Sequence, residues 1–289
     1  MDVSIILVNY NTKDLTRNCL KSIYEKVSGL EFDVWVTDNG SIDGSCEMIK
    51  NEFPQVNLIE AGENLGFGRA NNLAIQQSKA KYVLLLNTDT VLINNAPKIF
   101  FDFMEQNPKA AVCGGNLYNE NNKHVHSYGH LPTLKEKCIR TFQLTAFYPR
   151  IKQKIRDKGN NENNEFKQVD QIIGADMFVR KSVLDEVGYF DPEFFLYFEE
   201  SELQFRIKQE GWHAYILPDA EIYHFEGKST KKKKAKTEAK LKSEYLFYKK
   251  CYKLKKLSPY KLVFMLSHIV RLFVTPLLIL KVWLYIIKS

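Results

Sequence analysis

The chain has 289 residues, of which 45% are hydrophobic and 26% are charged. This balance is typical of a folded protein and excludes a wholly disordered, collagen-like or multi-span membrane chain. The five cysteines are widely scattered and form no CxxC pair. Their spacing argues against a zinc ribbon or a dense disulfide framework and favours a reducing compartment.

The formal net charge of +7 is distributed unevenly along the chain. Residues 1–227 hold 24 Lys+Arg and 32 Asp+Glu, a net charge of −8, whereas residues 228–261 hold 14 Lys and 2 Glu, a net charge of +12. The sequence therefore predicts an acidic body followed by a basic arm, residues 228–261, with an anionic partner of its own.

Strands and helices alternate over the first 114 residues. The pattern predicts strands at 4–8, 34–37, 56–60, 82–86 and 111–114, and helices at 12–27, 43–53, 66–78 and 97–106. Short apolar runs between helices are typical of βαβ units. We therefore expect an α/β fold with a doubly wound, mostly parallel sheet and right-handed crossovers.

Residues 119–168 lack this regularity, and the polar run 159–165 indicates an exposed loop. Beyond them, the pattern predicts strands at 169–173, 177–179, 214–217 and 221–225, and helices at 182–187 and 199–209.

Polar residues follow each of the first four predicted strands, among them Asn9, Asn11, Asp38, Ser41, Asn64, Gly66, Asn87 and Asp89. Any one of these clusters is also what an ordinary turn contains. Ligands of open α/β sheets bind at the carboxyl ends of the strands. Four such clusters together therefore favour a site for a polar ligand that carries a ribose and phosphates.

Two common phosphate-binding motifs are missing from the sequence. No GxGxxG follows the first strand and no GxxxxGK[ST] is present, which disfavours a dinucleotide-binding fold and a P-loop NTPase. The phosphates must be neutralised in another way, and Mg²⁺ or Mn²⁺ held by Asp89 would serve, because these ions prefer oxygen ligands.

The chain resembles the inverting family 2 glycosyltransferases with the GT-A fold in four runs, SIILVNYNT, VTDNGSIDGS, ENLGFGRANN and LLLNTDT. It is most similar to the rhamnosyltransferase-like branch that builds bacterial surface polysaccharides, whose acceptor-side block and terminal histidine motif match GADMFVRKSVLDEVGYFDPEFFLYFEESELQFR and IYHFEGKS. The resemblance covers about residues 3–228 and is weakest over 119–168. It implies a GT-A domain over 1–227, with a nucleotide-sugar half at 1–118 and an acceptor half at 119–227.

The resemblance also implies which residues bind the donor: Asn9, Asn11, Asp38, Asn64, Gly66, Arg69, Asn71 and Asn87. Asp38 would accept a hydrogen bond from the imide N–H of uracil or thymine. Asn87-Thr88-Asp89 stands where the family has a DxD-like metal motif, so Asp89 becomes the main metal ligand because the first acid is Asn here. His224 would complete the metal or diphosphate site, although the residue alone is also compatible with a core histidine.

An inverting transfer needs one general base, which takes the proton of the attacking hydroxyl. Glu199 and Glu200 stand at the predicted start of a helix, where the helix dipole favours anions and where acids are also ordinary. The family has Glu-Asp at this pair and uses the second acid, so Glu200 is the expected base and Glu199 the runner-up. Tyr197 and Phe198, next to the pair, are compatible with stacking on sugars or with packing the core.

The C-terminal region combines the basic arm with an apolar stretch, residues 262–287, that is interrupted by His268, Arg271, Pro276 and Lys281. One clean membrane span needs about 20 apolar residues with few charges. We therefore expect helices that lie in the membrane interface, with the arm bound to anionic lipid. A solvated helix is the alternative, nucleic acid is disfavoured, and the apolar tail is also compatible with a homo-oligomer surface. Asp2 and the short apolar run 3–8 argue against a signal peptide.

Together these features predict a metal-dependent inverting glycosyltransferase at the cytoplasmic face of a bacterial inner membrane. It would move a sugar from a nucleoside-diphosphate sugar to a glycan acceptor that is lipid-linked. The rival hypothesis is a non-catalytic, membrane-tethered nucleotide- or carbohydrate-binding relative, to which the loss of the first DxD acid gives some support. The motifs do not distinguish a rhamnosyl donor from another hexosyl donor, because the residues that read the sugar lie outside them.

Overall fold

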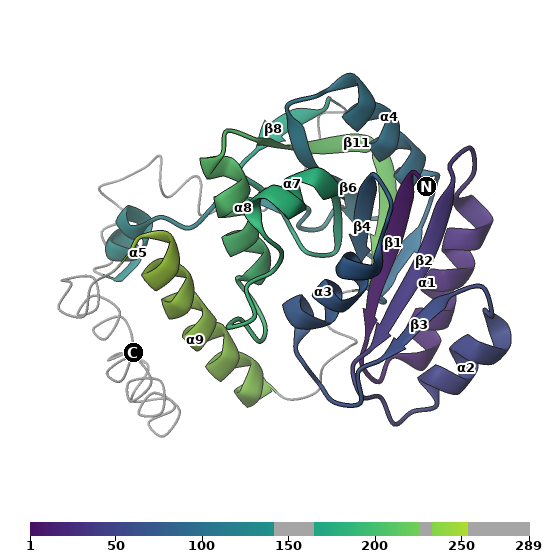
Figure 1. The fold of residues 1–289 in the computed structure, drawn as a ribbon. Coiled ribbons are helices and arrows are strands. Elements are labelled where there is room, and N and C mark those ends of the chain that lie inside the picture. Colours follow the sequence, from purple (N-terminus) through teal and green to yellow (C-terminus); the bar gives the residue numbers. More distant parts are fainter. Residues whose placement is uncertain (142–164, 226–232, 254–289) are drawn as a thin grey trace.

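The computed structural model describes residues 1–141, 165–225 and 233–253 (Figure 1). Most of the predicted polar loop at 159–165, the first lysines of the basic arm and the apolar stretch 262–287 lie outside the described residues.

The first half of the chain forms the parallel part of the sheet. Its elements are β1 (Val3–Asn9), α1 (Lys13–Lys26), β2 (Phe32–Asp38), α2 (Ser45–Glu52), β3 (Asn57–Glu60), α3 (Phe67–Gln77) and β4 (Tyr82–Leu86). β1 pairs in parallel with β2 and β4, and β2 pairs in parallel with β3. The predicted alternation is confirmed here, with boundaries that differ by only a few residues.

The second half makes the sheet mixed. Its elements are β5 (Thr90–Leu92), α4 (Ala96–Gln106), β6 (Ala110–Tyr118), β7 (Tyr128–Gly129), α5 (Leu134–Thr141), β8 (Lys167–Val169), β9 (Gln171–Ile172), β10 (Asp176–Arg180), α7 (Lys181–Val187), α8 (Glu199–Gln209), β11 (His213–His224) and α9 (Lys233–Cys251). The strand order is β3-β2-β1-β4-β10-β6-β11-β5. β10 runs antiparallel to both β4 and β6, and β11 runs parallel to β6 but antiparallel to β5.

Several predicted strands have other bounds in the structure: the strand expected at 111–114 is β6, which continues to Tyr118. The strand expected at 169–173 is divided into β8, which pairs with β11, and β9, which pairs with β7. The two expected closing strands are a single strand, β11, whose register shifts between Leu217 and Glu221. Pro218 lies in this interval and lacks the N–H that a regular ladder needs, so the strand bulges there instead of ending.

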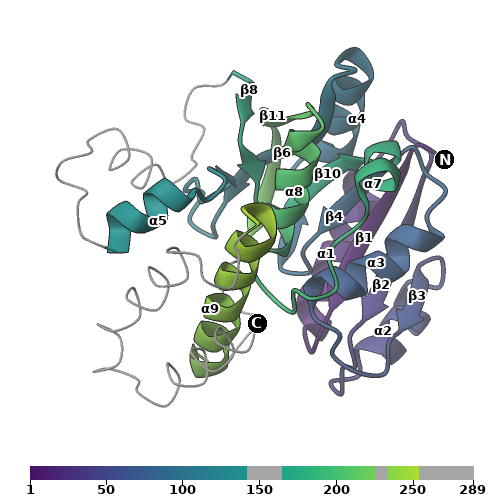
Figure 2. The same cartoon turned by 60° about the vertical axis from the view of Figure 1, so that its left-hand side comes forward.

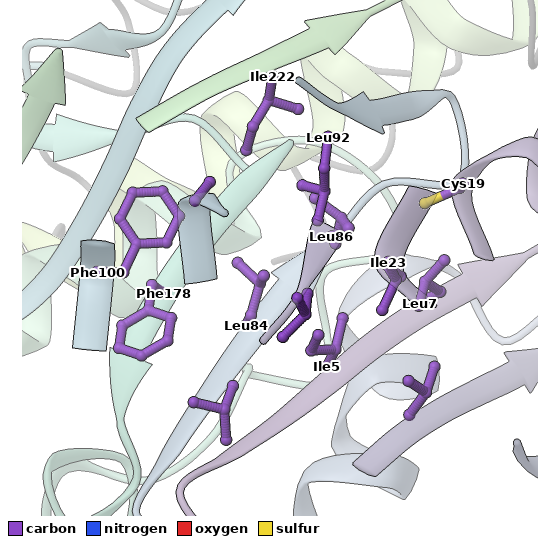
Figure 3. Close-up of a cluster of buried hydrophobic side chains, with 14 of the residues drawn as sticks. Ile5, Leu7, Cys19, Ile23, Leu84, Leu86, Leu92, Phe100, Phe178 and Ile222 are labelled. Atoms are coloured by element: carbon purple, nitrogen blue, oxygen red, sulfur yellow. The ribbon is translucent and has the colours of Figure 1, made fainter. Parts of the chain in front are cut away.

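Helices cover both faces of the sheet: α1, α2 and α4 lie on one face, and α3, α7 and α8 on the other (Figures 1 and 2). Side chains of β1 alternate between the two cores, because successive strand residues point to opposite faces. Ile5 and Leu7 pack with Ile23 of α1 (Figure 3), whereas Ile6 packs with Ile75 of α3. The central strands are therefore apolar on both faces.

Helix α9 belongs to the body and is not a plain solvated arm. It lies beside α8 (Figures 1 and 2), and its apolar residues form a third core cluster with Phe194: Leu241, Tyr245, Leu246, Phe247 and Tyr248. For this part of the arm, the aromatic residues that interleave with lysines serve packing. Within 1–141, 165–225 and 233–253, every helix is too short or too polar to cross a membrane.

Candidate active site

Asn9 is the centre of a hydrogen-bond network at the carboxyl ends of β1, β2 and β4. Its Nδ2 donates to Oδ2 of Asp38 at 2.6 Å, and its Oδ1 accepts from the hydroxyls of Thr12 and Thr16, each at 2.7 Å. The Thr12 hydroxyl also lies 3.1 Å from that of Thr88, in the loop after β4. The Asn9 side chain is therefore engaged within the protein, where it orients Asp38.

Asp38 is buried and held in one orientation. Besides Asn9, it accepts the backbone N–H of Ser41 at 2.8 Å. The side chain of Cys46 also hydrogen-bonds to Asp38. A carboxylate offers about four acceptor positions, so about one remains for a ligand. Asn11, in the left-handed region with φ 54°, joins the same two loops, because its N–H donates to Ser41 Oγ and its Oδ1 accepts from Ile42 N–H.

The loop before α3 is tied to the end of β2 by side-chain amides. Asn64 Oδ1 accepts from Asn39 Nδ2 at 3.2 Å and from Gly66 N–H at 3.0 Å. Asn39 Nδ2 also donates to the Gly66 carbonyl at 3.1 Å. Asn64 and Gly66 thus lie in one network with the residues that follow Asp38.

Arg69 and Asn71, both predicted to bind the donor, have different surroundings in α3. Asn71 is buried, and its Nδ2 donates to the Phe67 carbonyl of the same helix. Arg69 is exposed in the first turn and pairs with no carboxylate among the described residues. The guanidinium is therefore the one of the two that remains available to an anionic ligand.

Asp89 and His224, the two candidate metal ligands, lie next to each other. Oδ1 of Asp89 lies 3.5 Å from Nε2 of His224, and both residues are less than a tenth exposed. The contact is built by the pairing of β5 with β11, which places His224 opposite Thr90, and by the Phe225 N–H, which donates to the Asp89 carbonyl at 2.9 Å.

A carboxylate oxygen and an imidazole nitrogen this close fit a shared Mg²⁺ or Mn²⁺ ion. The described parts of the chain contain no cluster of three or more His, Cys, Asp or Glu residues that would enclose a metal by itself. The remaining coordination positions would therefore fall to substrate phosphates and water, which is the usual arrangement for Mg²⁺.

The turn at Gly174 and Ala175 lies between the loop after β4, which holds Asp89, and the acid pair of α8. The Asn87 N–H donates to the Ala175 carbonyl at 2.9 Å. A Cβ built on Gly174 would lie 3.9 Å from the Cβ of Glu200 and 3.7 Å from the ring of Phe67. Phe67 and Asn87 from residues 1–118 and Glu200 from residues 119–227 therefore lie around one turn.

Glu199 and Glu200 have different environments although they are neighbours in sequence. Glu199 is 3% exposed, and its Oε2 has no hydrogen-bond partner within the described structure. Burial, and then the charge of Glu200, raise the pKa of Glu199 well above its usual value. Glu200 is half-buried, and its pKa is raised by burial while the charge of Lys240 acts in the opposite direction. Burial therefore raises the pKa of Glu199 more strongly than that of Glu200, so Glu199 holds its proton to a higher pH than its neighbour.

Asp176 is a buried acid that the sequence interpretation missed. It begins β10, is fully buried, and accepts the Gly115 N–H at 2.6 Å on Oδ2, while Oδ1 has no partner in the described part of the chain. Burial raises its pKa to about 7, against the Gly115 hydrogen bond and the charge of His224. The sequence did contain a signal for this residue, because Asp176 directly precedes the apolar run of β10. Asp is rarely buried without a partner, so an acid at the start of a buried strand indicates a functional or hydrogen-bonded group.

Comparison with known proteins agrees with these features. The family model "Glycosyl transferase family 2" matches residues 4–188. The chain is 27% identical over 226 residues to an N-acetylglucosaminyl-diphospho-decaprenol L-rhamnosyltransferase of Mycobacterium tuberculosis, covering 74% of this chain and 73% of that protein. It is 25% identical over 214 residues to the low-salt glycan biosynthesis hexosyltransferase Agl10 of Haloferax volcanii, covering 73% of this chain and 62% of that protein.

Solved structures share the fold at low sequence identity. A crystal structure of GalNAc-T7 with UDP, GalNAc and Mn²⁺ matches with a TM-score of 0.61 and 13% identity, over 86% of this chain and 48% of that one. A mannosyltransferase from Pyrobaculum calidifontis in complex with GDP-Man and Mn²⁺ matches with a TM-score of 0.57 and 16% identity, over 97% of this chain and 73% of that one. The chain belongs to glycosyl transferase family 2 and is a glycosyltransferase with the GT-A fold.

Proposed function

We propose that this glycosyltransferase is inverting and metal-dependent, and that it moves a sugar from a nucleoside-diphosphate sugar to a hydroxyl of a glycan acceptor. One observation carries the proposal: the Asp89–His224 pair and the Glu199–Glu200 pair are joined through a single turn, Gly174–Ala175. A group suited to a metal diphosphate and a group suited to proton removal thus belong to one site.

The donor would lie along the strand ends. The remaining acceptor position of Asp38 suits the imide N–H of uracil or thymine, and the exposed Arg69 suits a phosphate. Asp89 and His224 would hold Mg²⁺ or Mn²⁺, which supplies positive charge against the diphosphate leaving group. Asn9, Asn11, Asn64 and Gly66 keep the surrounding loops in place through the hydrogen bonds described above.

Glu200 would act as the general base. It would accept the proton of the acceptor hydroxyl while the oxygen attacks the anomeric carbon from the face opposite the diphosphate. The unequal rise of the two pKa values supports this assignment, because Glu199 holds its proton to a higher pH than Glu200, and neighbouring carboxyls in different environments can take different roles.

The acceptor we propose is a lipid-linked glycan at the cytoplasmic face of a bacterial inner membrane, in surface polysaccharide synthesis. The Mycobacterium tuberculosis relative carries a diphospho-decaprenol acceptor in its name. The lysines of residues 228–261 suit anionic lipid, and the apolar stretch 262–287 suits the membrane interface. Rhamnose is the first donor sugar to test, because the same relative is named an L-rhamnosyltransferase.

The test incubates the purified full chain with Mn²⁺ and a panel of nucleoside-diphosphate sugars, with and without a lipid-diphosphate glycan acceptor. We expect acceptor-dependent nucleotide release with one donor, loss of release with EDTA, and an inverted anomeric configuration by NMR. Release that is unaffected by EDTA would remove the metal from the proposal. No release with any donor would favour the rival hypothesis of a binding protein with this fold.

A further inference from the structure

The segment that leads into the acid pair has an unusual backbone. Tyr197 and Phe198, immediately before Glu199, both adopt the left-handed region, with φ 70° and 67°. This region costs an L-residue about 1–2 kcal/mol. Two consecutive residues remain there only where their surroundings fix them, and such strain is concentrated at functional sites.

One side of this segment, residues 191–198, rests on the start of α3. The Phe67 N–H donates to the Phe195 carbonyl at 3.1 Å. The approach is so close that a Cβ on Gly66 would lie 2.2 Å from the same carbonyl oxygen. The segment is therefore in direct contact with the loop that we assign to the donor.

The other side is held by α9 through two polar anchors. Ser243 Oγ donates to the Leu196 carbonyl at 2.9 Å. Lys250 Nζ donates to Asp191 Oδ2 and to Glu193 Oε1, each at 2.5 Å. The Lys250–Asp191 pair is the stronger of the two, because both side chains are about three-quarters buried while Glu193 is mostly exposed.

An aromatic contact lies between these anchors. The ring of Phe247 is fully buried, with its centroid 5.7 Å from that of Phe198 and 6.1 Å from that of Phe205 in α8. Phe194, also fully buried, belongs to the same cluster. Helix α9 thus contacts the segment near its beginning, in its middle and at its last residue.

We propose that α9 is a positioning element for catalysis, in which Ser243 and Lys250 fix segment 191–198 and so aim Glu199 and Glu200 at the acceptor. This rests on the proposed role of the acid pair. Both residues act through the segment and neither touches the substrate. The lysine-rich helix would then be part of the catalytic machinery, beside any role of the arm at a membrane.

The test compares Lys250→Met, Lys250→Arg and Ser243→Ala in the full chain. Lys249→Met is the matched control, since Lys249 has no ion pair in the described structure. A misplacement of about 1 Å in a catalytic group costs up to about 100-fold in rate, so we expect Lys250→Met to lower kcat roughly 10- to 100-fold. Ser243→Ala removes one hydrogen bond and should lower kcat roughly two- to tenfold. Lys250→Arg and the control should stay within about twofold of the wild type.

Donor KM, nucleotide affinity by calorimetry and Tm separate positioning from a purely structural role. Positioning predicts that donor KM and nucleotide affinity stay near wild type while kcat falls, and that Lys250→Arg restores kcat. Wild-type kcat in both Lys250→Met and Ser243→Ala would overturn the inference, as would losses that only follow a lower folded fraction. Glu200→Gln and Glu199→Gln are assayed alongside: full turnover in both would overturn the assignment of the base itself, which is a separate failure.

Discussion

Glu199 holds its proton to a higher pH than Glu200, because burial raises the pKa of Glu199 more strongly. Burial favours the neutral form of Glu199, and Glu199→Gln replaces that form with a neutral group of the same shape. Glu200→Gln removes the carboxylate that we propose as the general base. Loss of a general base typically costs about 100- to 10,000-fold in rate.

We therefore expect Glu200→Gln to lower kcat by an amount in this range, with donor affinity almost unchanged, and Glu199→Gln to retain most of the activity. Initial rates at saturating donor, together with nucleotide binding by calorimetry, check both variants. A larger loss in Glu199→Gln than in Glu200→Gln would reassign the base to Glu199.

Asp89 is predicted to be the main protein ligand of the metal. Asp89→Ala should abolish turnover and Mn²⁺-dependent nucleotide binding, while the circular dichroism spectrum stays that of a folded protein. Mn²⁺ binding followed by electron paramagnetic resonance gives a readout that does not depend on turnover. Wild-type turnover of Asp89→Ala in the presence of EDTA would contradict a metal role.

Asp176 should make the stability of the metal-free protein depend on pH. Its pKa is raised by burial from 3.8 to about 7, so the folded state binds a proton that the unfolded state has already lost, and stability falls as pH rises between these values. Asp176→Asn still accepts the Gly115 N–H but does not ionise. Relative to wild type, we expect it to gain roughly 2 kcal/mol of unfolding free energy between pH 5.5 and pH 8. Urea denaturation with EDTA at both pH values measures this difference, and a constant difference would show that Asp176 ionises as freely in the folded protein as in the unfolded chain.

At the scale of the elements, local patterns predicted most of the parallel half of the sheet. β4 matches its predicted range because five apolar residues lie between polar neighbours, and the polar residues after the buried strands singled out Asp89 as a candidate. The antiparallel course of β10 was not predictable from the same signal, since its partners β4 and β6 lie far away in the sequence. β5 was not predicted, because a strand of three residues is too short to show an alternation of apolar and polar side chains. The packing of α9 was missed because its lysines dominated the composition and hid the apolar face.

Gly66 tests the contact between α3 and segment 191–198. It has φ +87°, and an added Cβ would meet the Phe195 carbonyl at 2.2 Å, so Gly66→Ala must displace backbone. We expect it to cost on the order of 2–4 kcal/mol of stability, from the left-handed backbone and the clash together. Gly62→Ala is the matched control, because Gly62 has φ +74° but open space around it, and it should lose only about 1–2 kcal/mol.

Thermal and urea unfolding of the two variants give these differences. Gly66→Ala should also weaken nucleotide binding, because Asn64 and Gly66 share hydrogen bonds with the loop after Asp38. Equal losses in both variants would mean that segment 191–198 yields easily to the added methyl group.

At the scale of the whole molecule, the net charge of −8 over residues 1–227 opposes binding to an anionic membrane, whereas the +12 of residues 228–261 favours it. Helix α9 lies within this basic region yet packs on the body, so a deletion that removes it would expose Phe194 and Phe205. The function of the region must therefore be tested with a cut after α9. Deleting residues 254–289 keeps α9 and removes the apolar stretch together with five lysines and one arginine: Lys255, Lys256, Lys261, Lys281, Lys288 and Arg271.

We expect the full chain to float with vesicles that contain anionic lipid, because each lysine near such a surface contributes about 1 kcal/mol. High salt should weaken this binding, since the Debye length falls from about 10 Å at 0.1 M to about 3 Å at 1 M. The chain without residues 254–289 keeps 11 of the 14 lysines of residues 228–261, so it should float more weakly than the full chain but still depend on anionic lipid. It should bind nucleotide normally and lose activity on a lipid-linked acceptor more than on a short soluble one. A chain that ends before α9 should instead aggregate or unfold at lower temperature, because its third core cluster is lost.

Flotation of the full chain with neutral vesicles, equally strong at high salt, would assign the anchor to the apolar stretch alone. If the full chain never floats, the membrane proposal fails, and sedimentation of both chains then shows whether residues 254–289 join copies of the protein instead.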